Sequence, residues 1–99
     1  MYYVYAIILD NTIRYIGQTK NIKNRQSSHR SAFKKGLSKE LYNFMRVNGY
    51  TEEHIVLEVV FSTSNAIECE LMEAFIIMKD WFEGEQLLKQ SLPKKIRYY

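Results

Sequence analysis

Two stretches rich in β-branched and aromatic residues flank a short polar turn at the start of the chain. Residues 2–9 read YYVYAIIL and residues 12–19 read TIRYIGQT, with Asp10-Asn11 between them. Strong β propensity on both sides of two turn-forming residues is typical of a β-hairpin. The sequence therefore predicts two antiparallel strands at its start, and the remaining residues must cover the small sheet that these strands begin.

The length of this turn decides which side chains of the hairpin share a face. A strict two-residue turn at Asp10-Asn11 with unbroken pairing would place Tyr5 and Tyr15 on opposite faces. An odd-length loop or a single β-bulge would place both tyrosines on the same face. Asn11 is the residue best suited to a left-handed conformation in this turn.

The middle of the chain predicts two helices and a third strand. A helix is expected to begin after the N-cap Asn21 and to stop at Gly36, and a second one to follow Ser38 and to stop at Asn48-Gly49. Residues 54–61, HIVLEVVF, have strong β propensity and are apolar on both sides, so we expect a central strand there.

A long helix is expected from residue 65 to residue 82, with Asn65 and Glu68 forming a capping box. One apolar arc of this helix is predicted to face the core, and its members are Ile67, Leu71, Ala74, Phe75, Met78, Trp81 and Phe82. Glu73 lies outside this arc, with Cys69 and Ile77 one turn away. A carboxylate in partly apolar surroundings indicates a single-metal site or an acid with a perturbed pKa, and a solvated glutamate is the alternative. Glu68 and Glu70 compete for the same role.

The element order β-β-α-α-β-α predicts an α+β fold, in which helices flank a small three-stranded antiparallel sheet. A chain of 99 residues is expected to form a single domain over residues 1–99. A short helix over residues 85–90 and a basic, aromatic tail are expected to end it.

Composition narrows the setting in which the chain acts. No apolar run is long enough to span a bilayer, and the N-terminus has no signal-peptide pattern. The single cysteine, Cys69, excludes an internal disulfide and a cysteine-cluster metal site. Two histidines, His29 and His54, do not give zinc spacing with it. A cytoplasmic protein with no membrane partner is expected.

Charge is segregated along the chain although the net charge is only +3. Between residues 14 and 50 the only acid is Glu40, whereas the basic residues there are Arg14, Lys20, Lys23, Arg25, Arg30, Lys34, Lys35, Lys39 and Arg46. Between residues 51 and 87 the balance reverses. A basic block of this kind is typical of a protein that binds a polyanion, and two solvated helices are the alternative interpretation.

Arg25 and His29 are the first candidates for chemistry within this block. They lie four residues apart on one predicted helix and therefore on the same face. A guanidinium suits phosphate oxygens, and an imidazole exchanges protons with water or phosphate. The alternative is a solvated arginine beside a histidine at the border of the core.

Three segments together resemble the GIY-YIG nuclease domain. They are YVYAI, RYIGQTKNIKNRQSSHR and AIECELMEAFIIMK, and the resemblance covers about residues 2–80. Its most specific part is the triplet Tyr15-Ile16-Gly17 followed by Arg25 and His29 at fixed offsets. The element order expected from the residues alone agrees with the fold of this family. The chain resembles the small, free-standing kind found in phages and mobile elements.

The resemblance implies a divalent-metal-dependent DNA endonuclease. It implies that Tyr5 and Tyr15 are the two tyrosines of the motif and that Gly17 permits close backbone approach. It further implies that Arg25 contacts the scissile phosphate, that His29 assists, and that Glu73 binds Mg²⁺ or Mn²⁺. DNA is the implied partner, and the residues expected to bind it are Lys20, Lys23, Arg30, Lys34, Lys35, Lys39 and Arg46.

Two departures from the family pattern define the alternatives. Tyr3 stands where the family often has glycine, and the asparagine usual after the glutamate helix is missing, with Gln86 or Gln90 as substitutes. A DNA-binding or regulatory descendant without turnover is therefore the second hypothesis. A protein-interaction module with an acidic partner is the third. The oligomeric state, monomer or homodimer, is left open.

Overall fold

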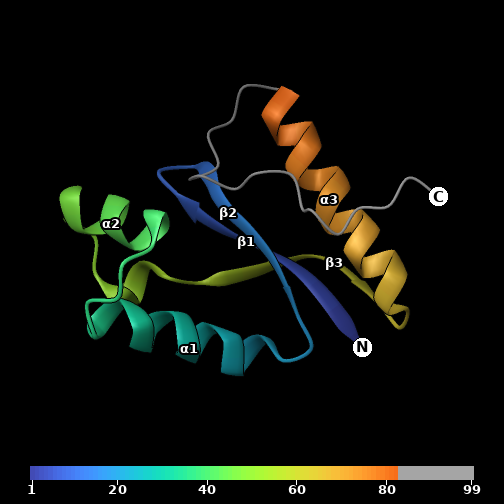
Figure 1. The fold of residues 1–99 in the computed structure, drawn as a ribbon, viewed down its shortest axis with the longest axis horizontal. Helices are drawn as coiled ribbons and strands as arrows, with labels where there is room; N and C mark the ends of the chain where they lie inside the picture. The colour runs from blue at the N-terminus through green and yellow to red at the C-terminus, as the bar shows by residue number, and fades with distance from the viewer. Residues whose placement is uncertain (83–99) are drawn as a thin grey trace.

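The computed structural model describes residues 1–82, which form one sheet with helices on both of its faces (Figure 1). The α+β fold and the predicted order of its elements are confirmed. In chain order the elements are β1 (Tyr2–Leu9), β2 (Thr12–Thr19), α1 (Ile22–Lys34), α2 (Glu40–Val47), the 3₁₀ turn η1 (Glu52–His54), β3 (Leu57–Thr63) and α3 (Ala66–Phe82). The helix and tail expected beyond residue 82 lie outside the described residues.

The three strands form an antiparallel sheet in the order β2-β1-β3. The expectation that the third strand is central was wrong, because among residues 1–82 β1 is central and β3 pairs with β1 alone. A stretch that is apolar on both sides predicted a strand buried on both faces, whereas Val59 and Val60 are both about half exposed, at 49% and 46%. Propensity alone does not distinguish an edge strand from a central one. The strand also begins later than expected, since His54 belongs to η1.

The hairpin combines a two-residue turn with a β-bulge. Asp10 and Asn11 both have positive φ, at 54° and 59°, as a turn that follows the strand twist requires. Ile8 pairs with Ile13 next to the turn, but the register shifts between Ile7 and Ile8. Beyond the shift, Tyr5 pairs with Gly17 and Ile7 pairs with Tyr15. The bulge therefore satisfies the condition set by the sequence, and Tyr5 and Tyr15 share a face.

Alternate residues of β1 enter two separate cores. Tyr5, Ile7 and Leu9 pack on the face covered by α1 and α2. Val4 and Ala6 pack on the opposite face, which α3 covers. This alternation follows from the two-residue period of a strand. The sheet is thus buried on both faces along its central strand, although the chain is short.

The predicted core arc of α3 was wrong for Ile67, Leu71 and Phe75, whereas Ala74 is buried as predicted. Ile67 and Phe75 are exposed, at 61% and 58%, whereas Cys69 and Ile77 are buried against the sheet. Apolar residues surround most of this helix, so periodicity allows more than one inward face. The face that packs carries Cys69 and Ala74, whose small side chains allow a close approach to the sheet.

The helix ends follow the sequence in most places. Asn21 accepts a hydrogen bond from the backbone N–H of Asn24 at 3.0 Å, and Gly36 has a φ of +78° after α1. Asn65 accepts a bond from the Glu68 N–H at 3.0 Å. Ser38 does not cap α2, since Lys39 holds the N-cap position without a side-chain bond. Within residues 1–82, no helix is long and apolar enough to cross a membrane.

Candidate active site

Tyr5 and Tyr15 lie side by side on the face of the sheet covered by α1 and α2. Their rings are stacked, with centroids 6.3 Å apart and planes inclined by 27°. Gly17, which pairs with Tyr5 across the hairpin, makes room for the Tyr5 ring. A Cβ at Gly17 would lie 2.5 Å from the Tyr5 hydroxyl oxygen and 2.6 Å from Cζ. Glycine is thus required here because any side chain would displace the phenol.

Replacing Gly17 with alanine is expected to lower the free energy of unfolding by about 1–3 kcal/mol, the usual cost of overpacking a core. The added methyl collides with the outer half of the Tyr5 ring. Denaturant unfolding measures this cost. In a Tyr5→Leu background the colliding atoms are gone, so the same replacement should cost much less. Equal costs in the two backgrounds would show that Gly17 does not act through Tyr5.

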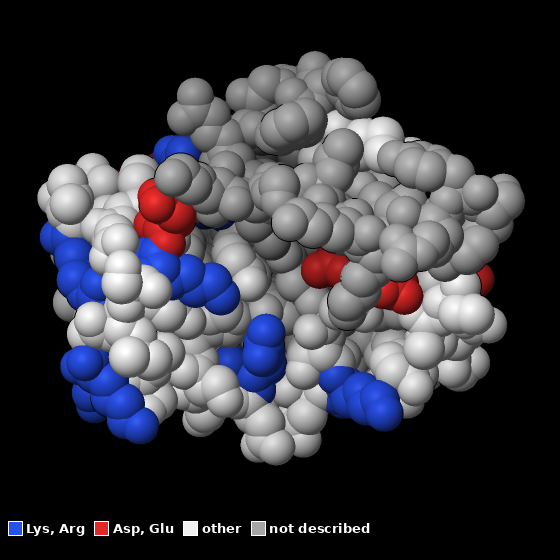
Figure 2. All heavy atoms as spheres, in the orientation of Figure 1, with Lys and Arg blue, Asp and Glu red and all other residues white. Residues whose placement is uncertain are grey.

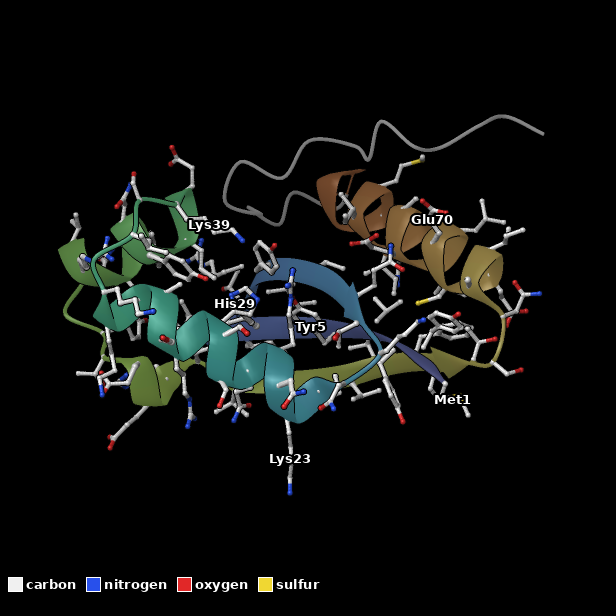
Figure 3. All side chains as sticks on the ribbon, turned by 60° about the horizontal axis from the view of Figure 1, so that its bottom comes forward. Met1, Tyr5, Lys23, His29, Lys39 and Glu70 are labelled. Atoms are coloured by element: carbon white, nitrogen blue, oxygen red, sulfur yellow. The ribbon has the colours of Figure 1, made fainter. Side chains whose placement is uncertain are left out.

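His29 of α1 lies beside Tyr5 (Figure 3), and it connects Tyr5 to a tyrosine of α2. Its Nε2 lies 2.9 Å from the Tyr5 hydroxyl, and its Nδ1 lies 2.7 Å from the hydroxyl of Tyr42. A neutral imidazole has one N–H and one acceptor nitrogen. His29 therefore donates to one of these tyrosines and accepts from the other, and the three groups form a continuous hydrogen-bonded chain.

Burial shifts the pKa values of the three side chains in this hydrogen-bonded chain. Burial, with repulsion from Lys39 and Arg25, lowers the pKa of His29 to about 4. Burial also raises the pKa of Tyr5 to about 12, although the hydrogen bond from Arg25 acts in the opposite direction. The pKa of Tyr42 is raised by burial as well. Near neutral pH the site therefore holds a neutral imidazole between protonated phenols.

The ring signals of His29 are expected to stay unchanged from pH 8 down to about pH 5 in an NMR titration. Because its folded pKa lies below the ordinary value of about 6.5, neutral His29 favours the folded state. That contribution to stability is complete above pH 6.5 and is lost as the pH falls toward 4. The chain has two histidines, so a His29→Gln variant assigns the signals. Titration of His29 near pH 6.5 would contradict its burial.

Two cations approach the tyrosines from the helices. Arg25 of α1 is exposed, and its Nε donates to the Tyr5 hydroxyl at 3.3 Å. Lys39, at the N-cap of α2, donates from Nζ to the Tyr15 hydroxyl at 3.1 Å and lies 4.6 Å from the centre of that ring. A hollow of about 180 Å³ lies between these cations, and its walls are Arg25, Ser28, His29, Ala32, Lys39 and Tyr42.

Glu73 of α3 reaches the same region from the other face of the sheet. Its Oε1 accepts a hydrogen bond from the side-chain amide of Gln18 at 2.8 Å. The carboxylate is half-buried, and its charge contributes to the raised pKa of Tyr5. Gln18 lies on β2, which is an edge strand, so groups from both faces can meet around it. Periodicity placed Glu73 away from the core, whereas the structure turns it toward the sheet.

The donor set allows one kind of metal site. Within residues 1–82 there is no group of three or more His, Cys, Asp or Glu side chains that could hold an ion. Glu73 would therefore be the protein ligand, and DNA oxygens and water would complete the coordination. Mg²⁺ is commonly bound in this way, through one or two carboxylates and substrate phosphates. The residues present fit such an ion, and they do not fit a closed structural site.

The basic residues predicted to bind DNA are used in different ways. Arg30 donates to the carbonyls of Ile55 and Glu53, and Arg46 donates to those of Phe33 and Leu37, so both hold the fold together. Lys39 belongs to the candidate site, and Lys20 lies 5.2 Å from the centre of the Tyr2 ring.

The exposed lysines of α1 point in different directions. Figure 3 shows Lys23 directed away from Tyr5 and His29. Lys34 is close to Lys23 around the helix at about 100° per residue, whereas Lys35 lies nearer to Arg25. On the face shown in Figure 2, Lys and Arg side chains follow α1 and α2 along the bottom and left, and acidic side chains lie at α3 on the right and at one place on the left. On this face, basic side chains thus lie along α1 and α2, the helices that cover the side of the sheet carrying the tyrosines.

Comparison with known proteins identifies the family. The family model described as the GIY-YIG catalytic domain matches residues 1–82. The chain belongs to the GIY-YIG family. This family is of the nuclease type, so the resemblance seen in the sequence is confirmed at that level. A search of the curated proteins and a search of the solved structures each returned no match.

Two residues of this GIY-YIG site escaped the sequence analysis. Tyr42 follows Lys39 by three positions and therefore shares its helix face, which is the one signal that links it to the site. Gln18 follows Gly17 directly, but only the packing of α3 shows that it holds Glu73. The segment after α3 has no asparagine, and its possible substitutes, Gln86 and Gln90, lie outside the described residues.

Proposed function

We propose that this GIY-YIG protein is a divalent-metal-dependent DNA endonuclease that hydrolyses phosphodiester bonds. The observation that supports it best is the set of contacts at one phenol. The Tyr5 hydroxyl is bonded to His29 and to Arg25, and the charge of Glu73 acts on the same group. A cation, a proton acceptor and a carboxylate around one hydroxyl are the parts that phosphodiester hydrolysis needs.

The two cations would hold the scissile phosphate. The Nε of Arg25 is bonded to Tyr5, and its terminal nitrogens would donate to the nonbridging oxygens. Lys39 borders the same hollow and adds a second positive charge. Both cations lie where negative charge grows as water attacks phosphorus, so they stabilise the transition state more than the bound substrate.

Tyr5 would activate the attacking water through the hydrogen-bonded chain. The water gives a proton to the Tyr5 oxygen as its own oxygen bonds to phosphorus, and the bond from phosphorus to the leaving sugar oxygen breaks. Tyr5 passes its hydroxyl proton to Nε2 of His29, whose Nδ1 proton moves on to Tyr42. A pKa of about 4 makes His29 a conduit rather than a lasting acceptor of this proton. Tyr42 borders the hollow and releases a proton there to solvent, and the leaving sugar oxygen takes up a proton from solvent water.

Glu73, oriented by Gln18, would hold the metal. A bound Mg²⁺ or Mn²⁺ supplies positive charge that neutralises the phosphate and the leaving oxygen. The hydrogen bond from Gln18 helps to fix the orientation of the carboxylate that would hold the ion.

The native protein is expected to convert supercoiled plasmid to open circles in Mg²⁺ or Mn²⁺ and to leave it intact in EDTA. Agarose gels measure the conversion, and filter binding in EDTA measures DNA affinity on the same preparation. Binding without cleavage in either metal would contradict the proposal and favour the second candidate, a DNA-binding descendant without turnover. Absence of both binding and cleavage would favour the interaction module with an acidic partner.

A further inference from the structure

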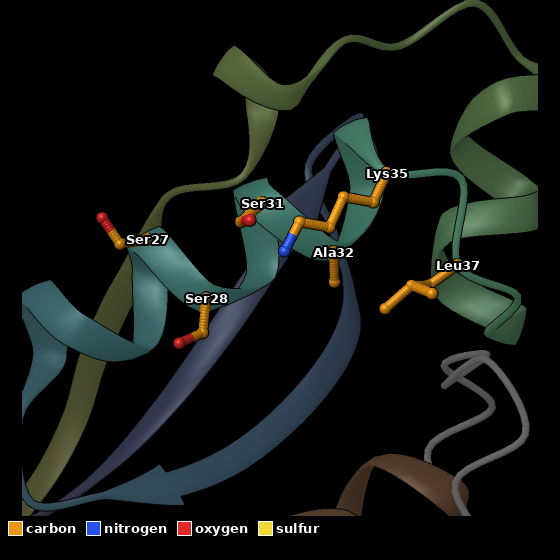
Figure 4. A pocket seen from close by; sticks show the side chains of 6 residues that line it. All are labelled: Ser27, Ser28, Ser31, Ala32, Lys35 and Leu37. Atoms are coloured by element: carbon orange, nitrogen blue, oxygen red, sulfur yellow. The ribbon is translucent and has the colours of Figure 1, made fainter.

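A second hollow on α1 continues from the candidate active site. It has a volume of about 430 Å³, and its walls are Ser27, Ser28, Ser31, Ala32, Lys35 and Leu37 (Figure 4). Ser28 and Ala32 also border the smaller hollow beside Arg25 and His29. The two hollows therefore share a wall, and a strand-like ligand that lies in one of them can extend into the other.

The hydroxyl groups of this second hollow are available to a ligand. Ser27, Ser28 and Ser31 are exposed, and within residues 1–82 their hydroxyls make no hydrogen bond. A serine inside a helix often bonds back to a carbonyl one turn earlier, which these three do not do. Lys35 adds the one charge among the six residues of the wall. Hydroxyl and ammonium groups are common contacts of the nucleic-acid backbone.

The remaining wall is apolar. Leu37, in the loop after α1, is 53% exposed and stands across the hollow from Ser28 in Figure 4. Ala32 forms the floor between the two hollows. A hydroxyl-lined side facing an exposed leucine suits a ligand that has a charged face and a carbon-rich face, as a sugar–phosphate unit has.

The distance along α1 from Arg25 indicates how far this hollow lies from the phosphate that would be cleaved. The ten residues from Arg25 to Lys35 cover roughly 15 Å of helix axis. A DNA strand advances by about 3.4 Å per nucleotide. The hollow therefore extends to about four nucleotides from a phosphate bound at Arg25.

We infer that this hollow binds the sugar–phosphate backbone of the cleaved strand, within about four nucleotides of the scissile phosphate. The inference rests on the proposed function, because it takes Arg25 as the place where the strand is cut. Ser27, Ser28 and Ser31 donate to the flanking phosphates, Lys35 neutralises one of them, and Leu37 contacts the sugar. Backbone contacts of this kind fix the position of a strand without reading its bases.

DNA binding in EDTA tests the hollow without requiring cleavage. Fluorescence anisotropy with a labelled 20-base-pair duplex compares the native chain with Ser27→Ala/Ser31→Ala and with Lys35→Met. The double serine variant should bind about 10-fold more weakly, because two bonds to charged oxygens are lost. Lys35→Met should also lower the slope of log affinity against log salt by about 0.9.

Matched variants outside the hollow serve as controls. Ser62→Ala/Ser64→Ala changes two exposed serines at the end of β3, and Lys79→Met removes a charge from α3. Both should bind as the native chain does. Native-like affinity and salt slope in the hollow variants would overturn the inference, and so would an equal loss in the controls.

Cleavage of modified duplexes tests the position of the hollow relative to the cut. Uncharged methylphosphonates replace single phosphates within four nucleotides of a mapped cleavage site. One such replacement should slow the native chain and have no further effect on Lys35→Met. The same slowing in both would overturn the inference. If the native chain does not cleave, the proposed function fails, and the binding comparison still decides whether the hollow holds DNA. Equal occupation by inorganic phosphate alone, seen as matching NMR shifts at Ser31 and Lys35, would reject the DNA assignment.

Discussion

Replacing Arg25 with alanine is expected to slow DNA cleavage about 10³-fold, the usual effect of removing a donor that stabilises a transition-state oxyanion. The side chain has two roles in the proposed mechanism. Its Nε bonds the Tyr5 hydroxyl, and its terminal nitrogens would bind the phosphate. Single-turnover kinetics at saturating protein measure the chemical step apart from DNA affinity.

Two further variants distinguish the guanidinium from a simple positive charge. Arg25→Lys keeps the charge but loses the planar fork, so it should recover only a small part of the rate. Lys23→Ala removes a charge from the same helix on the side directed away from Tyr5 (Figure 3), and it should cleave at nearly the native rate. A larger loss with Lys23→Ala than with Arg25→Ala would contradict the placement of the phosphate.

Replacing Glu73 with glutamine is expected to abolish metal-dependent cleavage while DNA binding in EDTA is retained. The amide has the same shape, and its carbonyl oxygen can still accept the hydrogen bond from Gln18. Only the negative charge is lost, and with it the affinity for a hard cation that prefers carboxylate oxygen. Gel assays of cleavage and anisotropy in EDTA measure the two properties.

Glu70→Gln is the matched control for this replacement. Glu70 lies on the same helix and competed with Glu73 in the sequence (Figure 3). It should keep the native cleavage rate. Loss of cleavage in Glu70→Gln with activity retained in Glu73→Gln would move the metal site to Glu70.

The hairpin shows how much of the fold could be predicted from the sequence. β propensity and the turn residues predicted both strands. The pairing register showed that Tyr5 and Tyr15 could share a face only if the hairpin had one extra residue, in the turn or as a β-bulge. The structure supplies that residue as a bulge next to Ile7 and Ile8. The sequence could not place the bulge, because its position depends on how the hairpin packs rather than on any single residue type.

The third helix shows where periodicity fails. Its sequence is apolar on most sides, so the arc through Ile67 and Phe75 fits a buried face as well as the arc through Cys69 and Ile77 does. The sheet selects the second arc, and this choice turns Glu73 toward Gln18. Long-range packing of this kind is absent from any local window of sequence. The family resemblance indicated Glu73 where periodicity alone left it undecided.

Lys39 shows that the sequence could not assign separate roles to the basic residues. The basic block indicated a polyanion-binding surface but treated its members alike. The structure distinguishes Arg30 and Arg46, which bond backbone carbonyls, from Lys39, which bonds the Tyr15 hydroxyl. Such differences depend on which carbonyl or hydroxyl lies within reach, and that depends on how α1 and α2 pack against each other.

The dependence of the single-turnover rate on Mg²⁺ concentration, measured for the native chain and for Glu73→Gln, tests the central claim most directly. We expect the native rate to be zero in EDTA and to rise to saturation with Mg²⁺, and the variant to remain inactive at every concentration. A native rate that does not depend on the metal, or the same curve for both proteins, would contradict a nuclease that uses a metal on Glu73.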